Sequence, residues 1–452
     1  MRATDAFTWH MEQDPTLRST VVAVMWLDRA PDWDVVVDRI DRLSRQVPMM
    51  RQRIVEVPWR LATPRWTYDP AFDLLWHLRR VEAPSPHTRE TVLEMAREAA
   101  MAAFDRARPL WEFTIVEGLL GGEAALLVKM HHSLTDGVGS MQMLPLIFDL
   151  ERTGDDRGPM PEAPRGEQYD AAAILRDGAL TALERTGGFV RDQLVATLPR
   201  LAHSVRHPIG TVQSTIAMAG SVYRTTAPMT DTKSPVMRER ATVRRVFTLQ
   251  VPLDELRSAA KSMDSTVNDA FLTAVTGGLR RYHERHDAPV DELRVVVPIS
   301  IRTGEDMAWG NRITLQRLTV PIDVADPAIR MRLVHSVCRV ARDEPSLPVT
   351  DTIAGALNLL PAGYVGGLLK HVDFLASNVP GVSIPVYLAG AEVSGIFAFG
   401  PTIGASVNVT LVSYQGTCDI GINVDCAAVA DPEVLVDCLR EGFEEVGQLA
   451  AT

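Results

Sequence analysis

The sequence is poor in cysteine and has no long uncharged hydrophobic run. Only four of its 452 residues are cysteines, and no two of them have a C-x-x-C spacing. These features argue against a disulfide framework and against a zinc site, so we expect four reduced thiols. No stretch is apolar over the length of a membrane-spanning helix. Residues 1–7 show no apolar segment of the kind found in secretory signals, and we expect a cytoplasmic protein.

A surplus of positive charge is also missing. The net charge of −11 argues against a nucleic-acid partner, because binding phosphates requires clustered Lys and Arg. A membrane surface stays compatible with this charge, since a local basic face is enough to bind anionic lipid. Residues 176–206 contain five arginines against three acidic residues. The helix-forming segment 170–223 around them either lies on an anionic lipid surface or packs on its own domain.

The length and the hydrophobic content of 46% predict a globular chain with two cores. Apolar runs rich in β-branched residues predict strands, and apolar residues at helical spacing predict helices between them. The fold class is therefore α/β (α+β), with two halves. We expect one lobe at 1–155, a linker with a helical connector at 156–230, and a second lobe at 231–452. The expected strands are 20–27, 113–117, 124–130, 241–250, 293–301, 384–388, 405–411 and 418–424, and the expected helices are 34–46, 88–104, 141–150, 253–261 and 267–279.

The most informative segment is the motif H-H-x-x-x-D-G, which begins at His131 and His132 and ends at Asp136 and Gly137. It follows a predicted hairpin with a Gly-Gly turn, so the histidines are expected on a strand-to-helix loop. The imidazole pKa lies near neutrality, so a ring nitrogen can take a proton from a hydroxyl or amine at pH 7. The Asp-Gly pair suggests a turn that holds the imidazole in place.

Further segments turn this motif into a family resemblance. They are Arg108-Pro109-Leu110-Trp111-Glu112, Val267-Asn268-Asp269, Pro298-Ile299-Ser300-Ile301-Arg302, Gly310-Asn311-Arg312 and Ser377-Asn378-Val379-Pro380-Gly381. The ordered set resembles the bacterial bifunctional wax ester synthase/acyl-CoA:diacylglycerol acyltransferase (WS/DGAT) family. The double-histidine motif alone would also fit chloramphenicol acetyltransferase-like enzymes and peptide-synthetase condensation domains. The resemblance covers nearly the whole chain except the helical connector.

The resemblance implies a two-lobed fold of the chloramphenicol acetyltransferase-like, CoA-dependent acyltransferase type, with a central tunnel between the lobes. It implies that acyl-CoA is the co-substrate and that no cofactor or metal is needed. The acceptor would be diacylglycerol or a long-chain alcohol, and the protein would work at a membrane or lipid-droplet surface. The second histidine, His132, would deprotonate the acceptor hydroxyl, which would attack the thioester directly. In agreement, no Gly-x-Ser-x-Gly segment offers a serine nucleophile.

The other residues of the candidate site have both functional and structural interpretations. His131 either takes part in the chemistry or shapes the loop beneath His132. The resemblance implies that Asp136 forms a structural ion pair, for which Arg302 is the candidate partner. Gly137 is expected to be needed for the backbone conformation and not for substrate contact. Asn268 either points its amide at the thioester oxygen or simply lies in a helix start. The spacing of Asp269 and Thr266 is that of a capping box.

Four residues are candidates for substrate binding. Trp111 is either a ligand contact or a core anchor. Ser377, Asn378 and Gly381 either line the acyl or acceptor channel or form a turn before a strand. The rival functions are an acyltransferase that uses a polyketide or glycolipid hydroxyl, and a non-catalytic protein that binds lipid or membrane.

Overall fold

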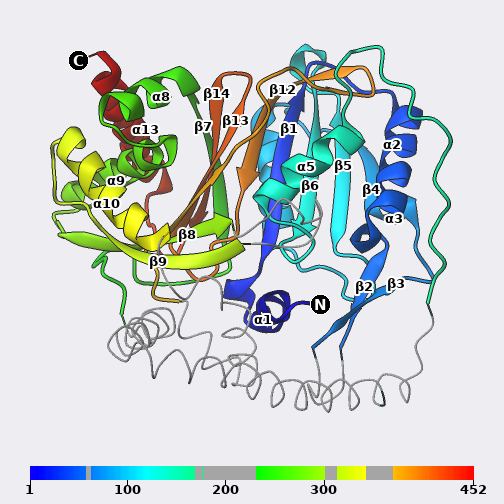
Figure 1. Cartoon of the computed structure of the whole chain (residues 1–452), viewed down its shortest axis with the longest axis horizontal. Helices are drawn as coiled ribbons and strands as arrows, with labels where there is room; N and C mark the ends of the chain where they lie inside the picture. Colours follow the sequence, from blue (N-terminus) through cyan, green and yellow to red (C-terminus); the bar gives the residue numbers. More distant parts are fainter. Residues whose placement is uncertain (57–62, 168–175, 177–230, 301–312, 343–369, 452) are drawn as a thin grey trace, which may run out of the picture.

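Two six-stranded mixed β-sheets stand side by side and carry helices on their faces (Figure 1). The computed structural model describes residues 1–56, 63–167, 176, 231–300, 313–342 and 370–451. We call each sheet with its helices a lobe. The α/β class and the two-lobed arrangement are confirmed, whereas the predicted connector 170–223 lies outside the described residues, apart from Arg176.

The first sheet has the strand order β11-β12-β1-β6-β5-β4 and forms the right-hand lobe of Figure 1. Its strands are β1 (Thr20–Leu27), β4 (Leu78–Glu82), β5 (Trp111–Glu117), β6 (Ala124–His131), β11 (Tyr387–Leu388) and β12 (Ala391–Phe399). Four of them come from the first half of the chain, but β11 and β12 come from the second half. Since β12 pairs antiparallel with β1, the C-terminal part of the chain completes the first sheet.

The second sheet has the order β7-β14-β13-β10-β8-β9. Its strands are β7 (Arg244–Pro252), β8 (Glu292–Ser300), β9 (Ile313–Pro321), β10 (Phe374–Val379), β13 (Val407–Tyr414) and β14 (Thr417–Asp425). A separate two-stranded sheet pairs β2 (Gln52–Val55) with β3 (Arg65–Tyr68). Strand β10 pairs in parallel with β13 and with β8, and this pairing brings its C-terminal end toward the first lobe.

Helices pack on both sheets. They are α1 (Ala3–Met11), α2 (Trp33–Gln46), α3 (Leu74–His77), α4 (Arg89–Met101), α5 (Gly137–Ile147), α8 (Leu253–Ser262), α9 (Val267–Arg285), α10 (Pro327–Arg342) and α13 (Pro432–Gln448), with short 3-10 helices at Pro15–Leu17, Pro48–Met50, Leu120–Gly122 and Leu449–Ala451. In Figure 1, α8, α9, α10 and α13 lie together on the left, against the second sheet. None of the helices within the described ranges combines the length and the apolar character needed to cross a bilayer.

Local chemistry explains the elements that the sequence predicted. Helix α2 begins where the Asp32 carboxylate accepts hydrogen bonds from the next turn, and its stripe of Val36, Ile40 and Leu43 is buried. The expected hairpin is also confirmed, because β5 and β6 pair antiparallel through a turn in which Gly121 and Gly122 both have φ near 80°. All four cysteines are free thiols, as expected.

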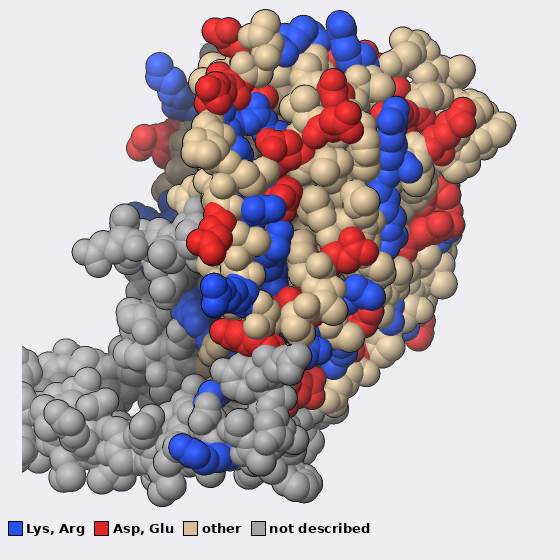
Figure 2. Space-filling model, turned by 90° about the vertical axis from the view of Figure 1, so that its right-hand side faces the viewer, with Lys and Arg blue, Asp and Glu red and all other residues tan. Residues whose placement is uncertain are grey.

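Charged side chains of both signs are interspersed on the outer face of the first lobe (Figure 2). Exposed charges of the first lobe also form ion pairs, such as Arg80 with Glu117 and Arg89 with Glu123. Pairs this exposed contribute little to stability, about 0–1 kcal/mol each. This face therefore offers no single-sign field that would attract a charged polymer.

Candidate active site

The double-histidine motif lies on the loop between β6 and α5, as predicted. Strand β6 ends at His131, opposite Thr20 of β1, and α5 begins at Gly137. The loop is anchored by its backbone, because the amide of His132 donates to the carbonyl of Ser19 and the amide of Leu134 donates to that of His131. Both histidines are thus held at the end of a central strand pair.

His131 is fully buried, and each of its ring nitrogens lies near a polar group. Its Nδ1 accepts a hydrogen bond from the Ser133 amide at 3.1 Å, so the proton of the neutral ring is on Nε2. Nε2 lies 3.1 Å from Oε1 of Glu12, which also accepts the amide of Ser19 at 2.7 Å. Although burial opposes it, the His131 contact holds the pKa of Glu12 below its ordinary value. His131 therefore ties α1 to the loop.

His132 lines a cavity to which both lobes contribute. Burial lowers the pKa of His132, while a hydrogen bond to its own backbone and the charge of Asp136 act in the opposite direction. The ring borders the cavity, where it can meet a substrate hydroxyl.

Asp136 is the N-cap of α5. Its Oδ1 accepts the amide of Gly139 at 2.7 Å, and its carbonyl accepts the hydroxyl of Ser140 at 2.9 Å. The predicted partner Arg302 lies outside the described residues, so this ion pair stays a prediction. Gly137 meets the opposite lobe, since a Cβ there would lie 2.7 Å from Cγ2 of Val379. The close approach requires glycine, as expected from its backbone role.

The cavity lies between the lobes and has a volume of about 160 Å³. Elements from both lobes line it. The first sheet, α2, α5 and their neighbouring turns contribute Val21, Ala23, Met25, Leu43, Met50, Phe113, Leu126, Val128, Met130, Met141, Met143, Leu144, Ile147, Phe148, Ile396 and Ala398. The second lobe and its connecting loop contribute Pro298, Leu315, Leu375, Ser377, Val379, Pro401, Ile403, Asn408, Thr410 and Val412. Apolar side chains dominate, as in sites that bind small apolar ligands.

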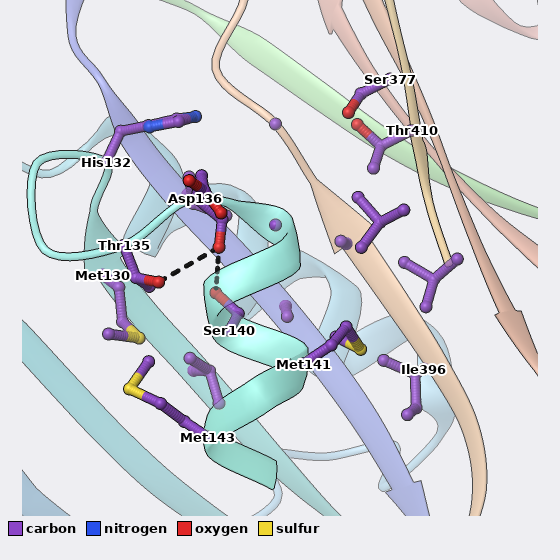
Figure 3. A pocket seen from close by; sticks show the side chains of 18 of the residues that line it. Met130, His132, Thr135, Asp136, Ser140, Met141, Met143, Ser377, Ile396 and Thr410 are labelled. Atoms are coloured by element: carbon purple, nitrogen blue, oxygen red, sulfur yellow. Dashed lines mark hydrogen bonds between the residues drawn. The ribbon is translucent and has the colours of Figure 1, made fainter. Parts of the chain in front are cut away.

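Polar and apolar groups are separated within this cavity (Figure 3). His132, Asp136 and Ser140 lie near one end, facing Ser377 and Thr410 across the gap, whereas Met141, Met143 and Ile396 lie at the other end. The hydroxyl of Thr410 donates to Asn408 Oδ1 at 2.8 Å. A substrate with a polar reacting group and a hydrocarbon tail fits this division.

Of the predicted substrate-binding residues near β10, only Ser377 lines the cavity. Ser377 and Asn378 are neighbours on a strand, so their side chains point to opposite faces, and Asn378 does not line the cavity. Gly381 is a packing residue, because a Cβ there would lie 2.0 Å from the carbonyl oxygen of Ser413. The expectation of a turn before a strand was wrong at residues 377–379, which form the end of β10.

Trp111 is a core anchor and does not reach the cavity. It is fully buried, its Nε1 donates to the carbonyl of Met50 at 2.7 Å, and its ring stacks on His77 at 4.6 Å. Phe72 stacks on the other side of His77 at 5.3 Å. Residues 72–77 and Trp111 thus form one aromatic stack. The candidate role of Trp111 in substrate contact is therefore corrected: Trp111 supports the fold around the site.

Asn268 and Asp269 lie in the first turn of α9. Asp269 forms the predicted capping box with Thr266 and also accepts from Nδ1 of His335 at 2.8 Å. Although burial opposes it, these hydrogen bonds hold the pKa of Asp269 below its ordinary value. Asn268 is half-buried and does not line the cavity, so the structure does not bring its amide to His132. Its contact with the thioester stays a prediction.

The sequence-based reasoning missed the apolar lining of the site. Five methionines line the cavity, and they are Met25, Met50, Met130, Met141 and Met143. Ala23 and Ala398 were also missed. The alternation of Val21, Ala23 and Met25 on one strand would have indicated a shared face, but it does not show that this face borders a cavity.

The fold defines the class of protein. The structure of a wax ester synthase/diacylglycerol acyltransferase from Marinobacter aquaeolei VT8 matches with a TM-score of 0.65 at 22% identity, covering 99% of this chain and 98% of that one. The first condensation domain of the calcium-dependent antibiotic synthetase matches with a TM-score of 0.64 at 14% identity, covering 100% and 96%. The fold is therefore that of the two-lobed CoA-dependent acyltransferases and condensation domains.

Sequence comparison narrows the class to a family. The model of the wax ester synthase/diacylglycerol acyltransferase catalytic domain matches residues 1–271, and the model of the WS/DGAT C-terminal domain matches residues 309–447. A Mycobacterium tuberculosis (strain H37Rv) protein named "Putative diacylglycerol O-acyltransferase" is 35% identical over 442 residues, which are 97% of this chain and 90% of the relative. The chain belongs to the WS/DGAT family and is an acyl-CoA-dependent O-acyltransferase.

Proposed function

We propose that the protein transfers a long-chain acyl group from acyl-CoA to diacylglycerol, to a long-chain alcohol, or to both, with His132 as general base. The observation that carries this proposal is the position of His132, which lies between a cluster of polar groups and a long apolar cavity. Such a site can hold the hydroxyl at the base while the hydrocarbon is kept away from water.

The proposed reaction needs one proton carrier. Nε2 of His132 takes the proton of the acceptor hydroxyl as the oxygen attacks the thioester carbonyl. The tetrahedral intermediate then collapses, the carbon–sulfur bond breaks, and the imidazolium returns its proton to the leaving thiolate. Asp136 lowers the cost of the imidazolium through its charge. General-base assistance of this kind contributes about 10²–10⁴-fold.

Ser377 and Asn268 are the remaining candidates for contact with the substrate. The Ser377 hydroxyl lines the cavity, where it would donate to the thioester oxygen or to the acceptor. His131, Gly137, Asp269 and Arg302 would support the site without touching substrate. No resident cofactor or metal has a part in this scheme.

We also propose that the protein works at a membrane or lipid-droplet surface, because both kinds of acceptor are water-insoluble lipids. Attachment would be peripheral and supported by apolar or basic surface segments. Flotation of the protein with anionic and neutral vesicles tests this part separately from catalysis, and protein that stays at the bottom of the gradient with every vesicle type would contradict it.

The acceptor is tested with purified protein and palmitoyl-CoA. Release of free thiol is followed with dipalmitoylglycerol, hexadecanol, a secondary alcohol and no acceptor, and each lipid product is identified by mass. We expect acceptor-dependent thiol release with diacylglycerol or hexadecanol, giving triacylglycerol or wax ester. Turnover with the secondary alcohol alone would favour a polyketide-like or glycolipid hydroxyl, and no turnover with any acceptor would contradict the proposed function.

A further inference from the structure

A groove runs from His132 along the inner face of the first sheet, beneath α5. On β1, β6 and β12 every second residue lines it, and the rows are in register: Ala23 pairs with Val128 and Ala398, and Met25 pairs with Leu126 and Ile396. From Met130 to Leu126 four strand residues span roughly 13 Å. The overlying part of α5, from Asp136 to Ile147, spans roughly 16 Å. The lining of the groove thus follows the strands and the helix over roughly 13 to 16 Å.

Two alanines form the floor of this groove near its middle. Ala23 and Ala398 face each other across β1 and β12, and both are partly exposed although β1 lies inside the sheet. Since both residues line the cavity, their exposed surface belongs to the groove. A larger side chain at either position would fill the space through which a ligand passes.

The strand register places Met25 and Leu126 at the end of the lining away from His132, and Phe148 follows the C-terminal end of α5. All three side chains are buried. The next residue in the chain, Asp149, is a fully buried carboxylate that pairs with Arg39 at 2.9 Å and with Arg157 at 2.8 Å. Arg157 also donates to the carbonyl of Phe148 at 2.7 Å. A hydrocarbon that reached past Phe148 would bury itself against these charges, which is unfavourable.

We infer that the groove holds one extended hydrocarbon chain with its reacting end at His132, and that Phe148, backed by the Asp149–Arg39–Arg157 ion pairs, sets the maximum chain length. The inference rests on the proposed function and adds to it the residues that determine specificity. Ala23 and Ala398 keep the middle of the groove open. The methionines around it adjust to chains of different shape, because thioether side chains are flexible, whereas the wall of Phe148 is fixed by the buried ion pairs behind it.

The test compares chain-length profiles of three variants. Rates are measured from octanoyl-CoA to eicosanoyl-CoA with one fixed alcohol, and then from octanol to eicosanol with one fixed acyl-CoA, so that the two series show which substrate occupies the groove. Phe148→Ala should shift the preference of one series to longer chains, and Ala23→Leu should shift the same series to shorter chains. We expect each shift to change the ratio of long-chain to short-chain rates by roughly ten-fold or more.

Matched controls separate specificity from folding. Phe443 is equally buried but packs in the second lobe, away from the cavity, so Phe443→Ala should lower the yield without changing either profile. Ratios within one preparation do not depend on the folded fraction. If Phe148→Ala is too unstable to assay, Ala398→Leu replaces it and must shift the series in the same direction as Ala23→Leu.

The outcomes distinguish the inference from the proposed function. Active variants with unchanged profiles in both series would overturn the inference and leave the proposed function intact. A wild-type protein without transfer activity would overturn the proposed function. In that case the groove is still tested by measuring how free fatty acids of graded length stabilise the protein against heat. Compared with wild type, Ala23→Leu must first lose the stabilisation by long chains. An identical length dependence in wild type and Ala23→Leu would overturn the inference.

Discussion

At the scale of single residues, the two adjacent histidines have different surroundings. His131 accepts the Ser133 amide at Nδ1 and has its Nε2 3.1 Å from Glu12, in a fully buried position edge-on to Trp9. His132 instead lines the cavity, and burial lowers its pKa. The family resemblance implied unequal roles for the two histidines. The contact with Glu12, at the C-terminal end of α1, was not predicted, because no local pattern in the sequence pairs it with a residue so far along the chain.

The lowered pKa of His132 gives a prediction for the pH dependence of catalysis. The ordinary histidine value is 6.5, and burial lowers it here. The ring therefore stays neutral and basic above that pH and gains a proton only as the pH falls through the lowered value. We expect kcat/KM to be flat above about pH 6.5 and to fall on the acid side with an apparent pKa below that value.

The measurement is a pH profile of kcat/KM for acyl-CoA between mild acid and neutral pH. Asp136 acts to raise the pKa of His132, so Asp136→Asn should move the acid limb further down in whatever activity remains. An acid limb in the wild-type protein at or above pH 6.5 would show that the catalytic base is not a buried imidazole.

At the scale of elements, the start of α5 is positioned by its contact with β10. Gly137 approaches Val379 so closely that any side chain would overlap it, and both residues border the cavity. This contact joins the loop that carries His132 to the strand that carries Ser377. The helix start thus sets the distance between the two sides of the site.

Gly137→Ala should force α5 and β10 apart. We expect a loss of about 1–3 kcal/mol in the free energy of unfolding, the usual cost of overpacking, together with lower activity. Urea denaturation gives the first quantity and thiol release the second. The double variant Gly137→Ala/Val379→Ala removes the overlapping methyl groups and should recover part of both losses. A double variant whose losses equal the sum of those of the two single variants would contradict this explanation.

The elements also show which parts of the fold a sequence can predict. Strand β1, helix α2 and the β5–β6 hairpin have strong periodicity or clear end signals, and they were predicted within a few residues. The sequence of β10 is also typical of a turn because it contains Ser377 and Asn378. Its pairing with β13 and β8 makes it a strand. Strand β12 was missed for a similar reason, since Gly395 interrupts its apolar run.

At the scale of the whole molecule, the two halves of the chain depend on each other. Strand β12 lies between β11 and β1, so residues 391–399 supply one side of the first sheet. The cavity is equally shared, with lining residues from Val21 to Val412. The motif identifies the polar end of this cavity from the sequence alone. The part of the cavity that is lined by apolar side chains forms only when strands from both halves of the chain pair, so it could not be predicted.

A fragment containing residues 1–155 should therefore not fold by itself. Without β11 and β12 it would present β1 as an open edge with exposed backbone donors and acceptors, and we expect aggregation. Size-exclusion chromatography and urea denaturation measure this. Co-expression with residues 231–452 supplies the missing strands and should yield a soluble complex. A monomeric 1–155 fragment with cooperative unfolding would contradict the interdependence of the halves.

The central claim is that His132 is the catalytic base of the transfer reaction. The most direct measurement is the rate of acceptor-dependent thiol release by His132→Gln, compared with wild type and with His286→Gln, whose ring lies at the end of α9 away from the cavity. General-base catalysis by His132 predicts a loss of at least about 10²-fold for His132→Gln, with an unchanged melting temperature, and near wild-type rates for His286→Gln. A folded His132→Gln protein that turns over at the wild-type rate would contradict it.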